Sequence, residues 1–237
     1  MSVPATPTSD FRIVPVLCVA DVPAAVGLLG AVFGFAPESS ARVRRGDQII
    51  ELMAAPAGIV PGHGPIDHLA LAVGDADAAM QALLACGGQL DAGVTPDGPL
   101  EIAAFWENGV RYVFFTGPDG AHIELCAQRG VGLGDATLRG HDHIGISCRD
   151  IAASEAFYTG LGMRLAFSAT LDAPAGQVPV RFLRRGGFTV ELYSPPELRA
   201  GQMVRSETPL WHGLRFEGAG RSGVFAGPDG ERIELLS

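Results

Sequence analysis

The sequence contains little cysteine and no long apolar run. Its 4 Cys among 237 residues form no Cys-x-x-Cys pair and lie inside apolar stretches, at Cys18, Cys86, Cys126 and Cys148. We expect small buried side chains there rather than disulfides or thiolate metal ligands. The apolar run at 13–20 is short and is interrupted by Pro15. The sequence therefore predicts no signal peptide and no membrane-spanning helix, which favours a cytoplasmic protein.

Positive charge is also scarce. The chain carries 17 Lys and Arg against 26 Asp and Glu, which gives a formal net charge of −9 at pH 7. Proteins that bind a nucleic-acid backbone or an anionic membrane surface need a basic patch, so we expect neither as the main partner. The composition, 47% hydrophobic and 18% charged, is that of a globular protein. We expect a small-molecule partner and a monomer or homodimer.

One stretch of the chain occurs twice. The sequence Asp67-His-Leu-Ala-Leu-Ala-Val73 returns as Asp142-His-Ile-Gly-Ile-Ser-Cys148, and an Asp follows each His after seven positions. Alternating apolar residues predict a strand in each copy, and the Ala-rich segment after each second Asp predicts a helix capped by that Asp. A repeated unit of this length indicates a fold built from similar modules.

Four such modules can be traced. A leader, 1–10, rich in Pro and polar residues, precedes them. Each complete module reads as a strand, a helix and further strands; in the first these are strands at 12–20, 39–45 and 48–53, with a helix at 24–33. The modules span 11–56, 66–128, 141–195 and 210–237, with linkers between them. The fourth is truncated, since its His212 and Glu234 lie about 34 positions closer together than His68 and Glu124, roughly a helix and a strand.

Matched polar residues occupy the first and last strands of the modules. An ionised carboxylate in the middle of a strand is costly to bury unless it is paired or binds a metal, and strand alternation turns these side chains away from the helices, toward the concave face of a curved sheet. Taken singly, each His could be a hydrogen-bonded structural group and each Glu could pair with an Arg. The module pairs are Val14 and Glu51, His68 and Glu124, His143 and Glu191, and His212 and Glu234.

Recurrence at matched positions favours metal ligation over these structural interpretations. Imidazole and carboxylate together suit a borderline or hard divalent ion such as Zn, Ni, Mn or Fe(II). Two His and two Glu would leave coordination positions open for water or substrate, as a catalytic site requires. The predicted metal ligands are His143, Glu191, His68, Glu124, His212 and Glu234.

The motifs resemble those of the vicinal oxygen chelate superfamily, which includes glyoxalase I, extradiol dioxygenases and bleomycin-type resistance proteins. The resemblance rests on the two Asp-His starts, the Asp seven residues after each His, and Gly-Pro-Asp-Gly-x-x-Ile-Glu-Leu at 117–125 and 227–235. It implies an α+β fold of βαβββ modules that form two cupped, mostly antiparallel sheets, a divalent metal held by first and last strands, and a substrate that chelates the metal through two oxygens. Val14 and the truncated fourth module depart from this pattern.

The pairing of the modules remains open at this point. In sequential pairing, 11–128 forms an N-terminal glyoxalase-like domain and 140–237 a C-terminal one, and the second of these offers His143, Glu191, His212 and Glu234. In the inside-outside pairing that resembles fused glyoxalases, modules 2 and 3 supply His68, Glu124, His143 and Glu191. Both arrangements include His143 and Glu191.

Three functions fit this sequence. The first is a metal-dependent lyase or isomerase that moves a proton beside a carbonyl, with Glu191 or Glu124 as the base. The second is an Fe(II) ring-cleaving dioxygenase using His143, His212 and Glu234, although Phe114 and Val224 stand where the extradiol signature has Tyr. The third is a protein that sequesters a drug or metabolite in a cleft lined by aromatic side chains, for which Phe105, Trp106, Phe114, Tyr193 and Trp211 are available.

Overall fold

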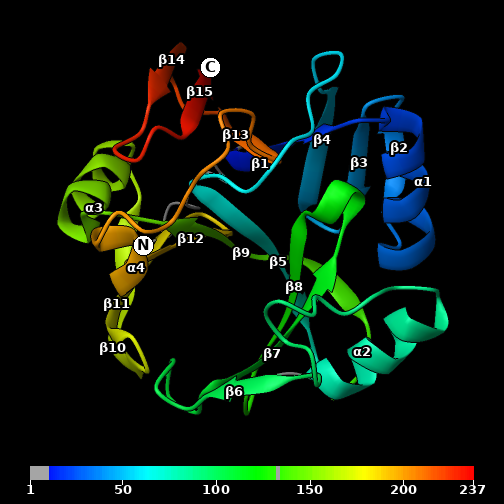
Figure 1. The fold of residues 1–237 in the computed structure, drawn as a ribbon, viewed down its shortest axis with the longest axis horizontal. Coiled ribbons are helices and arrows are strands. Elements are labelled where there is room, and N and C mark those ends of the chain that lie inside the picture. Colours follow the sequence, from blue (N-terminus) through cyan, green and yellow to red (C-terminus); the bar gives the residue numbers. More distant parts are fainter. Residues whose placement is uncertain (1–10, 132–133) are drawn as a thin grey trace, which may run out of the picture.

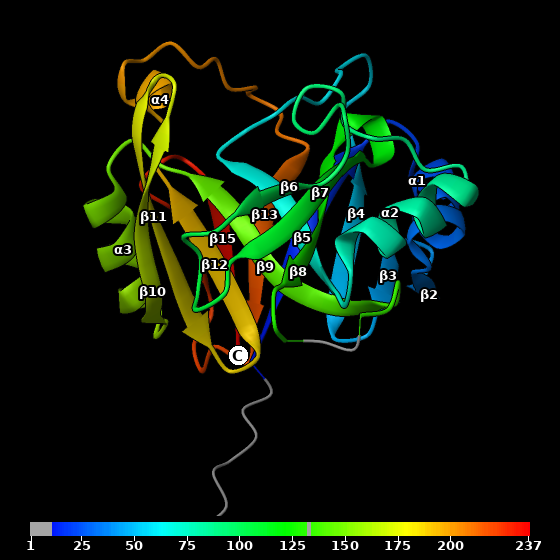
Figure 2. The ribbon, with the colours of Figure 1, turned by 90° about the horizontal axis from the view of Figure 1, so that it is seen from below.

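The protein folds into two curled sheets with a few covering helices (Figures 1 and 2). The computed structural model describes residues 11–131 and 134–237, so the predicted leader at 1–10 lies outside the described residues. The helices are α1 (Val22–Phe33), α2 (Ala76–Ala85), α3 (Ile151–Gly160) and α4 (Pro196–Arg199), with a 3-10 turn, η1, at Pro118–Gly120. The predicted α+β architecture is confirmed.

The first sheet has seven strands. It is built from the first module and the truncated fourth, with β1 of one antiparallel to β13 of the other. Its spatial order is β14 (Gly223–Ala226), β15 (Arg232–Leu236), β13 (Trp211–Glu217), β1 (Arg12–Val19), β4 (Gln48–Ala54), β3 (Arg42–Arg45) and β2 (Ala36–Ser39).

The second sheet has eight strands and is built from the second and third modules, which meet at the antiparallel pair β5 and β9. Its order is β10 (Arg164–Ala173), β11 (Gly176–Arg185), β12 (Phe188–Tyr193), β9 (Leu138–Ser147), β5 (Ile66–Val73), β8 (His122–Gln128), β7 (Val110–Thr116) and β6 (Leu100–Ile102). The modules thus pair inside-outside. The ranges 11–128 and 140–237 do not form one sheet each, because both sheets take strands from both ranges.

The predicted caps explain where the long helices begin. Asp21, Asp75 and Asp150 are extended residues whose carboxylates accept backbone N–H groups of the first helical turn. Helices α2 and α3 pack against strands of the eight-stranded sheet, and α1 packs against the seven-stranded sheet. The aliphatic face of every central strand is thereby buried, which leaves the opposite face of the eight-stranded sheet free to build a pocket.

The repeated Gly-Pro-Asp-Gly turns connect the two sheets. The carboxylate of Asp119, in the turn before β8, accepts the backbone N–H of Ala20, just before α1. In the same way Asp229, in the turn before β15, accepts the N–H of Arg149, just before α3. Each turn therefore docks on the chain that enters a helix of the other sheet, which gives this motif a structural role in both halves.

Three local predictions are wrong. The expected strand at 39–45 is interrupted by a turn at residues 40–41, between the end of β2 and the start of β3. Cys86 is exposed rather than buried, because it follows the last turn of α2 on the solvent side. The third linker contains the short helix α4.

Within residues 11–131 and 134–237, no helix is both long enough and apolar enough to span a membrane.

Candidate metal centre

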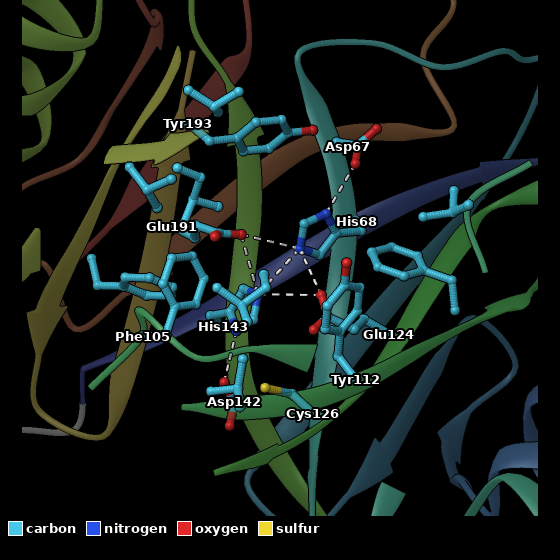
Figure 3. Close-up of a pocket in the computed structure, with 18 of the residues that line it drawn as sticks. Asp67, His68, Phe105, Tyr112, Glu124, Cys126, Asp142, His143, Glu191 and Tyr193 are labelled. Atoms are coloured by element: carbon cyan, nitrogen blue, oxygen red, sulfur yellow. Dashed lines mark hydrogen bonds and ion pairs between the residues drawn. The ribbon is translucent and has the colours of Figure 1, made fainter. Parts of the chain in front are cut away.

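Strand register brings four predicted ligands together on the concave face of the eight-stranded sheet (Figure 3). Across the β5–β9 pair, His68 lies opposite Gly145 and His143 lies opposite Ala70. The flanking strands are parallel to these two, so that β8 places Glu124 beside Ala70 and β12 places Glu191 beside Gly145. Each Glu therefore stands next to the two His residues, although Glu124 and Glu191 come from different modules.

The two imidazoles face each other at the centre of this group. Nε2 of His68 lies 3.1 Å from Nε2 of His143. Glu124 Oε2 lies 3.2 Å from the His68 nitrogen and 3.5 Å from the His143 nitrogen. Glu191 Oε2 lies 3.4 Å and 3.3 Å from the same two atoms. All four side chains are buried, with His68 and His143 only 4% and 3% exposed, so water does not screen them.

Each His is oriented by the Asp that precedes it. His68 Nδ1 lies 3.0 Å from Asp67 Oδ2, and His143 Nδ1 lies 2.7 Å from Asp142 Oδ1. The β5–β9 register shifts at both Asp residues, and such a bulge lets two consecutive side chains reach the same face of the sheet. With Nδ1–H donated to the carboxylate, the Nε2 lone pair of each ring points into the centre, as in the carboxylate–histidine–metal arrangement.

A glycine leaves room for His68. A Cβ at Gly145 would lie 2.0 Å from Cε1 and 2.4 Å from both nitrogens of the His68 ring, closer than any real Cβ contact. The Gly in the repeated motif of the third module therefore has a local reason, because a larger residue would push His68 out of the site.

The pKa values record how strongly these charges interact. Burial alone would lower the pKa of His68, but hydrogen bonds to Asp67 and to both Glu carboxylates raise it well above its usual value. Burial would also lower the pKa of His143, yet Glu124 and Asp142 raise it well above normal. Burial would raise the pKa of Glu191, but the two imidazoles lower it to about 2. The buried carboxylates of Glu124 and Glu191 therefore favour positive charge in this site.

The donor set fits a divalent ion. Ligand atoms around a tetrahedral zinc lie about 3.3 Å apart, given bonds of about 2.0 Å, and the distances here run from 3.1 Å to 3.5 Å. Two neutral imidazoles and two carboxylates supply two negative charges, which a divalent cation neutralises. His68, Glu124 and His143 also satisfy the geometric requirement for a shared metal ion.

Aromatic and aliphatic side chains form the walls of a cavity of about 250 Å³ above the four ligands. Phe105 and Phe182 pack edge to face, with 5.2 Å between their ring centroids. The ring centroids of Trp106 and Phe167 lie 4.8 Å apart. Trp106 adopts a left-handed backbone conformation, φ 53°, which costs free energy in a non-glycine residue and is typical of functional sites. No Lys or Arg is among the described residues that line this cavity.

Two tyrosines bring hydroxyl groups to the same cavity. Burial and the nearby Glu124 raise the pKa of Tyr112 to about 12, and burial together with Asp67 raises the pKa of Tyr193 well above normal. Both hydroxyls therefore stay protonated and can donate hydrogen bonds. Of the aromatic residues expected to line a cleft, Phe105, Trp106, Phe114 and Tyr193 do so, whereas Trp211 is buried in the main core.

The other two predicted ligands lie elsewhere. His212 and Glu234 belong to β13 and β15 of the seven-stranded sheet, so the dioxygenase set of His143, His212 and Glu234 is not brought together. The register also shows that His212 is not the counterpart of His143. Gly213 is, because it lies opposite Val16, the neighbour of Glu51, just as His143 lies opposite Ala70, the neighbour of Glu124.

An arginine occupies the corresponding centre of the seven-stranded sheet. Arg215 stands opposite Val14, at the position that Gly145 has in the other sheet. Its guanidinium forms an ion pair with Glu51, and its Nε lies 3.0 Å from Glu234 Oε2. With Val14 and Gly213 at the two His positions, this sheet has the two carboxylates but a fixed cation in place of two imidazoles.

Comparison with known proteins agrees with the modular fold described above. A sequence model of the Glyoxalase/Bleomycin resistance protein/Dioxygenase superfamily matches residues 12–125 and 140–218, more than half of the chain, which therefore belongs to this superfamily. The structure of glyoxalase I from Zea mays superposes with a TM-score of 0.69 at 16% identity, over 96% of this chain and 93% of that one. Two mutants of that enzyme match equally well.

A protein of Bacillus subtilis proposed to be a dioxygenase has a TM-score of 0.58 at 11% identity, over 94% of this chain and 83% of that one. Identities this low establish the fold alone. Among curated protein sequences, none matches this chain.

Several parts of the site were not predicted from the sequence. The repeat includes Asp67 and Asp142, but their role in orienting His68 and His143 depends on two bulges that strand alternation does not reveal. The clash that keeps Gly145 small depends on a strand from another module. In the sequence, the repeated motif is the one feature that points to Asp67, Asp142 and Gly145.

Proposed function

We propose that this protein is a metal-dependent lyase or isomerase that moves a proton next to a carbonyl group of a small substrate. The observation that carries the proposal is that Nε2 of His68 lies 3.1 Å from Nε2 of His143, and that one oxygen each of Glu124 and Glu191 lies 3.2–3.5 Å from both of these nitrogens. These are our proposed metal ligands. A divalent ion held there would polarise a substrate oxygen and stabilise negative charge that develops on it.

The protein residues would supply the remaining chemistry. Glu191 or Glu124 is the proposed base, since each carboxylate lines the cavity and is ionised, and one of them would loosen from the metal to take the proton. A carboxylate that stays ionised can accept a proton from a carbon beside the substrate carbonyl and return it to the neighbouring carbon. Tyr112, which keeps its proton, is placed to donate a hydrogen bond to the substrate.

The walls indicate the kind of substrate. Aromatic and aliphatic side chains surround the ligands, and two nearby arginines already have partners. Arg111 pairs with Asp77, and Arg184 lies over the ring of Trp106. We therefore propose a compact, largely apolar substrate with two neighbouring oxygens rather than a glutathione adduct. A cytoplasmic location and a monomeric or homodimeric state stay predictions.

Turnover by the metal-loaded protein tests this proposal. The protein, reconstituted separately with Zn²⁺, Ni²⁺, Mn²⁺ or Fe²⁺, is assayed with apolar 2-oxoaldehydes and 2-hydroxyketones, and exchange of the proton beside the carbonyl is followed by NMR in deuterated water. Glu191→Gln should lower kcat by about 10²–10⁴-fold, and its counterpart in the other sheet, Glu234→Gln, should not. Equal activity of both variants would contradict the proposal.

The same preparation tests ring cleavage, for which the aromatic cavity is the favourable observation. Two His and one carboxylate are the ligand set of Fe(II) oxygenases, and His68, His143 and either Glu could provide it. Oxygen uptake with catechols by the Fe²⁺ form, without proton exchange on carbonyl substrates, would favour this second function. A bound metal with neither activity would favour sequestration of a ligand.

A further inference from the structure

A second group of potential metal-binding side chains lies beside the central site, and of its three members only Asp67 lines the central cavity. His63 belongs to the segment between β4 and β5, Asp67 to the start of β5, and His122 to the start of β8. One potential ligand atom of each lies within 4.8 Å of the other two. Asp67 links the two groups, because it also orients His68, and the second group extends from there toward solvent.

The ring of His122 provides an independent sign of a missing partner. Its Nδ1 atom is buried and has no hydrogen-bond partner among the described residues, although Asp67 Oδ1 lies 3.4 Å away. The other nitrogen, Nε2, lies 3.3 Å from Asp91 Oδ2. With the ring proton on Nε2, directed at Asp91, the Nδ1 lone pair faces a carboxylate oxygen. This tautomer leaves two electron pairs facing each other, an arrangement that a cation between the two atoms would stabilise.

The two oxygens of Asp67 serve different neighbours. Oδ2 accepts the ring N–H of His68 at 3.0 Å, whereas Oδ1 is directed to His122. The separation of 3.4 Å between Oδ1 and the His122 nitrogen is close to the distance of about 3.3 Å between ligands of a tetrahedral zinc and longer than a normal N–H···O hydrogen bond. Asp67 can therefore bind an ion through one oxygen while the other keeps His68 in position.

His63 offers the third ligand from the solvent side. Its imidazole stacks on that of His122 with 4.0 Å between centroids and an angle of 27°. The side chain is exposed and can turn, while its backbone is held by the N–H of Ser206, which donates to the His63 carbonyl at 2.8 Å. An exposed imidazole whose backbone is held in place can close over an ion that enters from solvent.

We propose that His63, Asp67 and His122 form a second binding site for a divalent ion of the zinc class, with the fourth position open to water. Two imidazoles and one carboxylate form a common ligand set for zinc, and Asp91 orients His122 from the far side as in other carboxylate–histidine–zinc sites. The bound ion would fasten the segment that carries His63 to strands β5 and β8. Because one ligand is exposed, this ion should bind more weakly than the central one and be removed by dialysis.

Calorimetric titration of the full chain with Zn²⁺, after its central site has been loaded and the protein dialysed, tests the proposal. Wild type should take up a further equivalent, and His63→Ala should weaken this uptake more than about tenfold while it retains the ion that survives dialysis. His212→Ala, a half-buried His outside the group, and Cys86→Ser, an exposed thiol, are matched controls that should bind as wild type does.

Two results would overturn the proposal. One is unchanged uptake by His63→Ala, and the other is loss of the further equivalent in Cys86→Ser or His212→Ala, which would place the ion elsewhere. If His63→Ala binds weakly for reasons of stability, its thermal unfolding curve without added zinc would differ from that of wild type. An identical curve together with weakened uptake assigns the effect to the lost ligand.

Discussion

The two sheets share one plan but balance their inward-facing carboxylates with different cations. In the eight-stranded sheet, Glu124 and Glu191 face two imidazoles oriented by Asp67 and Asp142. In the seven-stranded sheet, the corresponding Glu51 and Glu234 form ion pairs with the guanidinium of Arg215. Arg215 carries a permanent positive charge, whereas the two imidazoles can be neutral and bind a cation in its place. The difference separates the proposed metal site from a centre whose charge is balanced within the chain.

The largest expected effect comes from the eight-stranded sheet. His143→Ala removes one imidazole and leaves two Glu carboxylates near a single ring, so the bound ion and the activity should be lost together. His212→Ala, in the other sheet, should change neither. Metal content by mass spectrometry and circular dichroism of both variants provide the check. A large loss of stability in metal-free His143→Ala would instead favour a structural role for the histidine.

A pH-dependent effect comes from His141, on the same strand as His143 but without carboxylate partners for its ring. His141 Nδ1 lies 2.7 Å from Gln48 Oε1 on the other sheet, and its Nε2 accepts the N–H of Thr189 at 2.9 Å. Burial lowers the pKa of His141 to about 4. The unfolded chain binds this proton below about pH 6.5 and the folded chain does not. Stability is therefore lost as pH falls from 6.5 toward 4, by up to about 3 kcal/mol.

Urea unfolding of wild type and His141→Gln at several pH values measures this loss. The glutamine can donate to Gln48 and accept from Thr189 without titrating, so the difference in free energy of unfolding between the two proteins should shrink from pH 7 to pH 4. A difference that does not depend on pH would show that His141 does not titrate in this range.

Gly145→Ala should weaken metal binding by about 10–100-fold, an effect comparable with losing a group that orients a ligand. Its Cβ would lie against the His68 ring and turn it away from His143. Gly213→Ala is the matched control in the other sheet, although its Cβ would approach the backbone of Arg232 at 2.8 Å. Isothermal titration with Zn²⁺ distinguishes them, because only Gly145→Ala should alter the tight equivalent.

The smallest effect is expected from Arg215→Met. It leaves Glu51 and Glu234 facing each other, but both carboxylates are about one quarter exposed and Arg42 remains 3.8 Å from Glu51. We expect a loss of about 1 kcal/mol in free energy of unfolding, since water screens part of the repulsion. Arg232→Met, more exposed and 3.9 Å from Glu234, should cost less. Equal losses would contradict a central role for Arg215.

The modular plan was predictable because strands and helices leave periodic signals and the Asp caps stand at fixed distances. The pairing of the modules was not, since no local pattern encodes which strands meet. The choice of His212 as a counterpart of His143 failed for a related reason. A register shift between Val16 and Leu17 moves the β13 chain by one residue, so that Gly213 takes the inward position. Sequence spacing alone does not show such a shift.

The most direct test of the central claim is the metal content of dialysed wild type, His143→Ala and Glu234→Gln. The account predicts one tightly held divalent ion per chain in wild type and in Glu234→Gln, and none in His143→Ala. No ion in wild type, or an ion that is lost from Glu234→Gln and kept by His143→Ala, would contradict the assignment of the metal to the eight-stranded sheet.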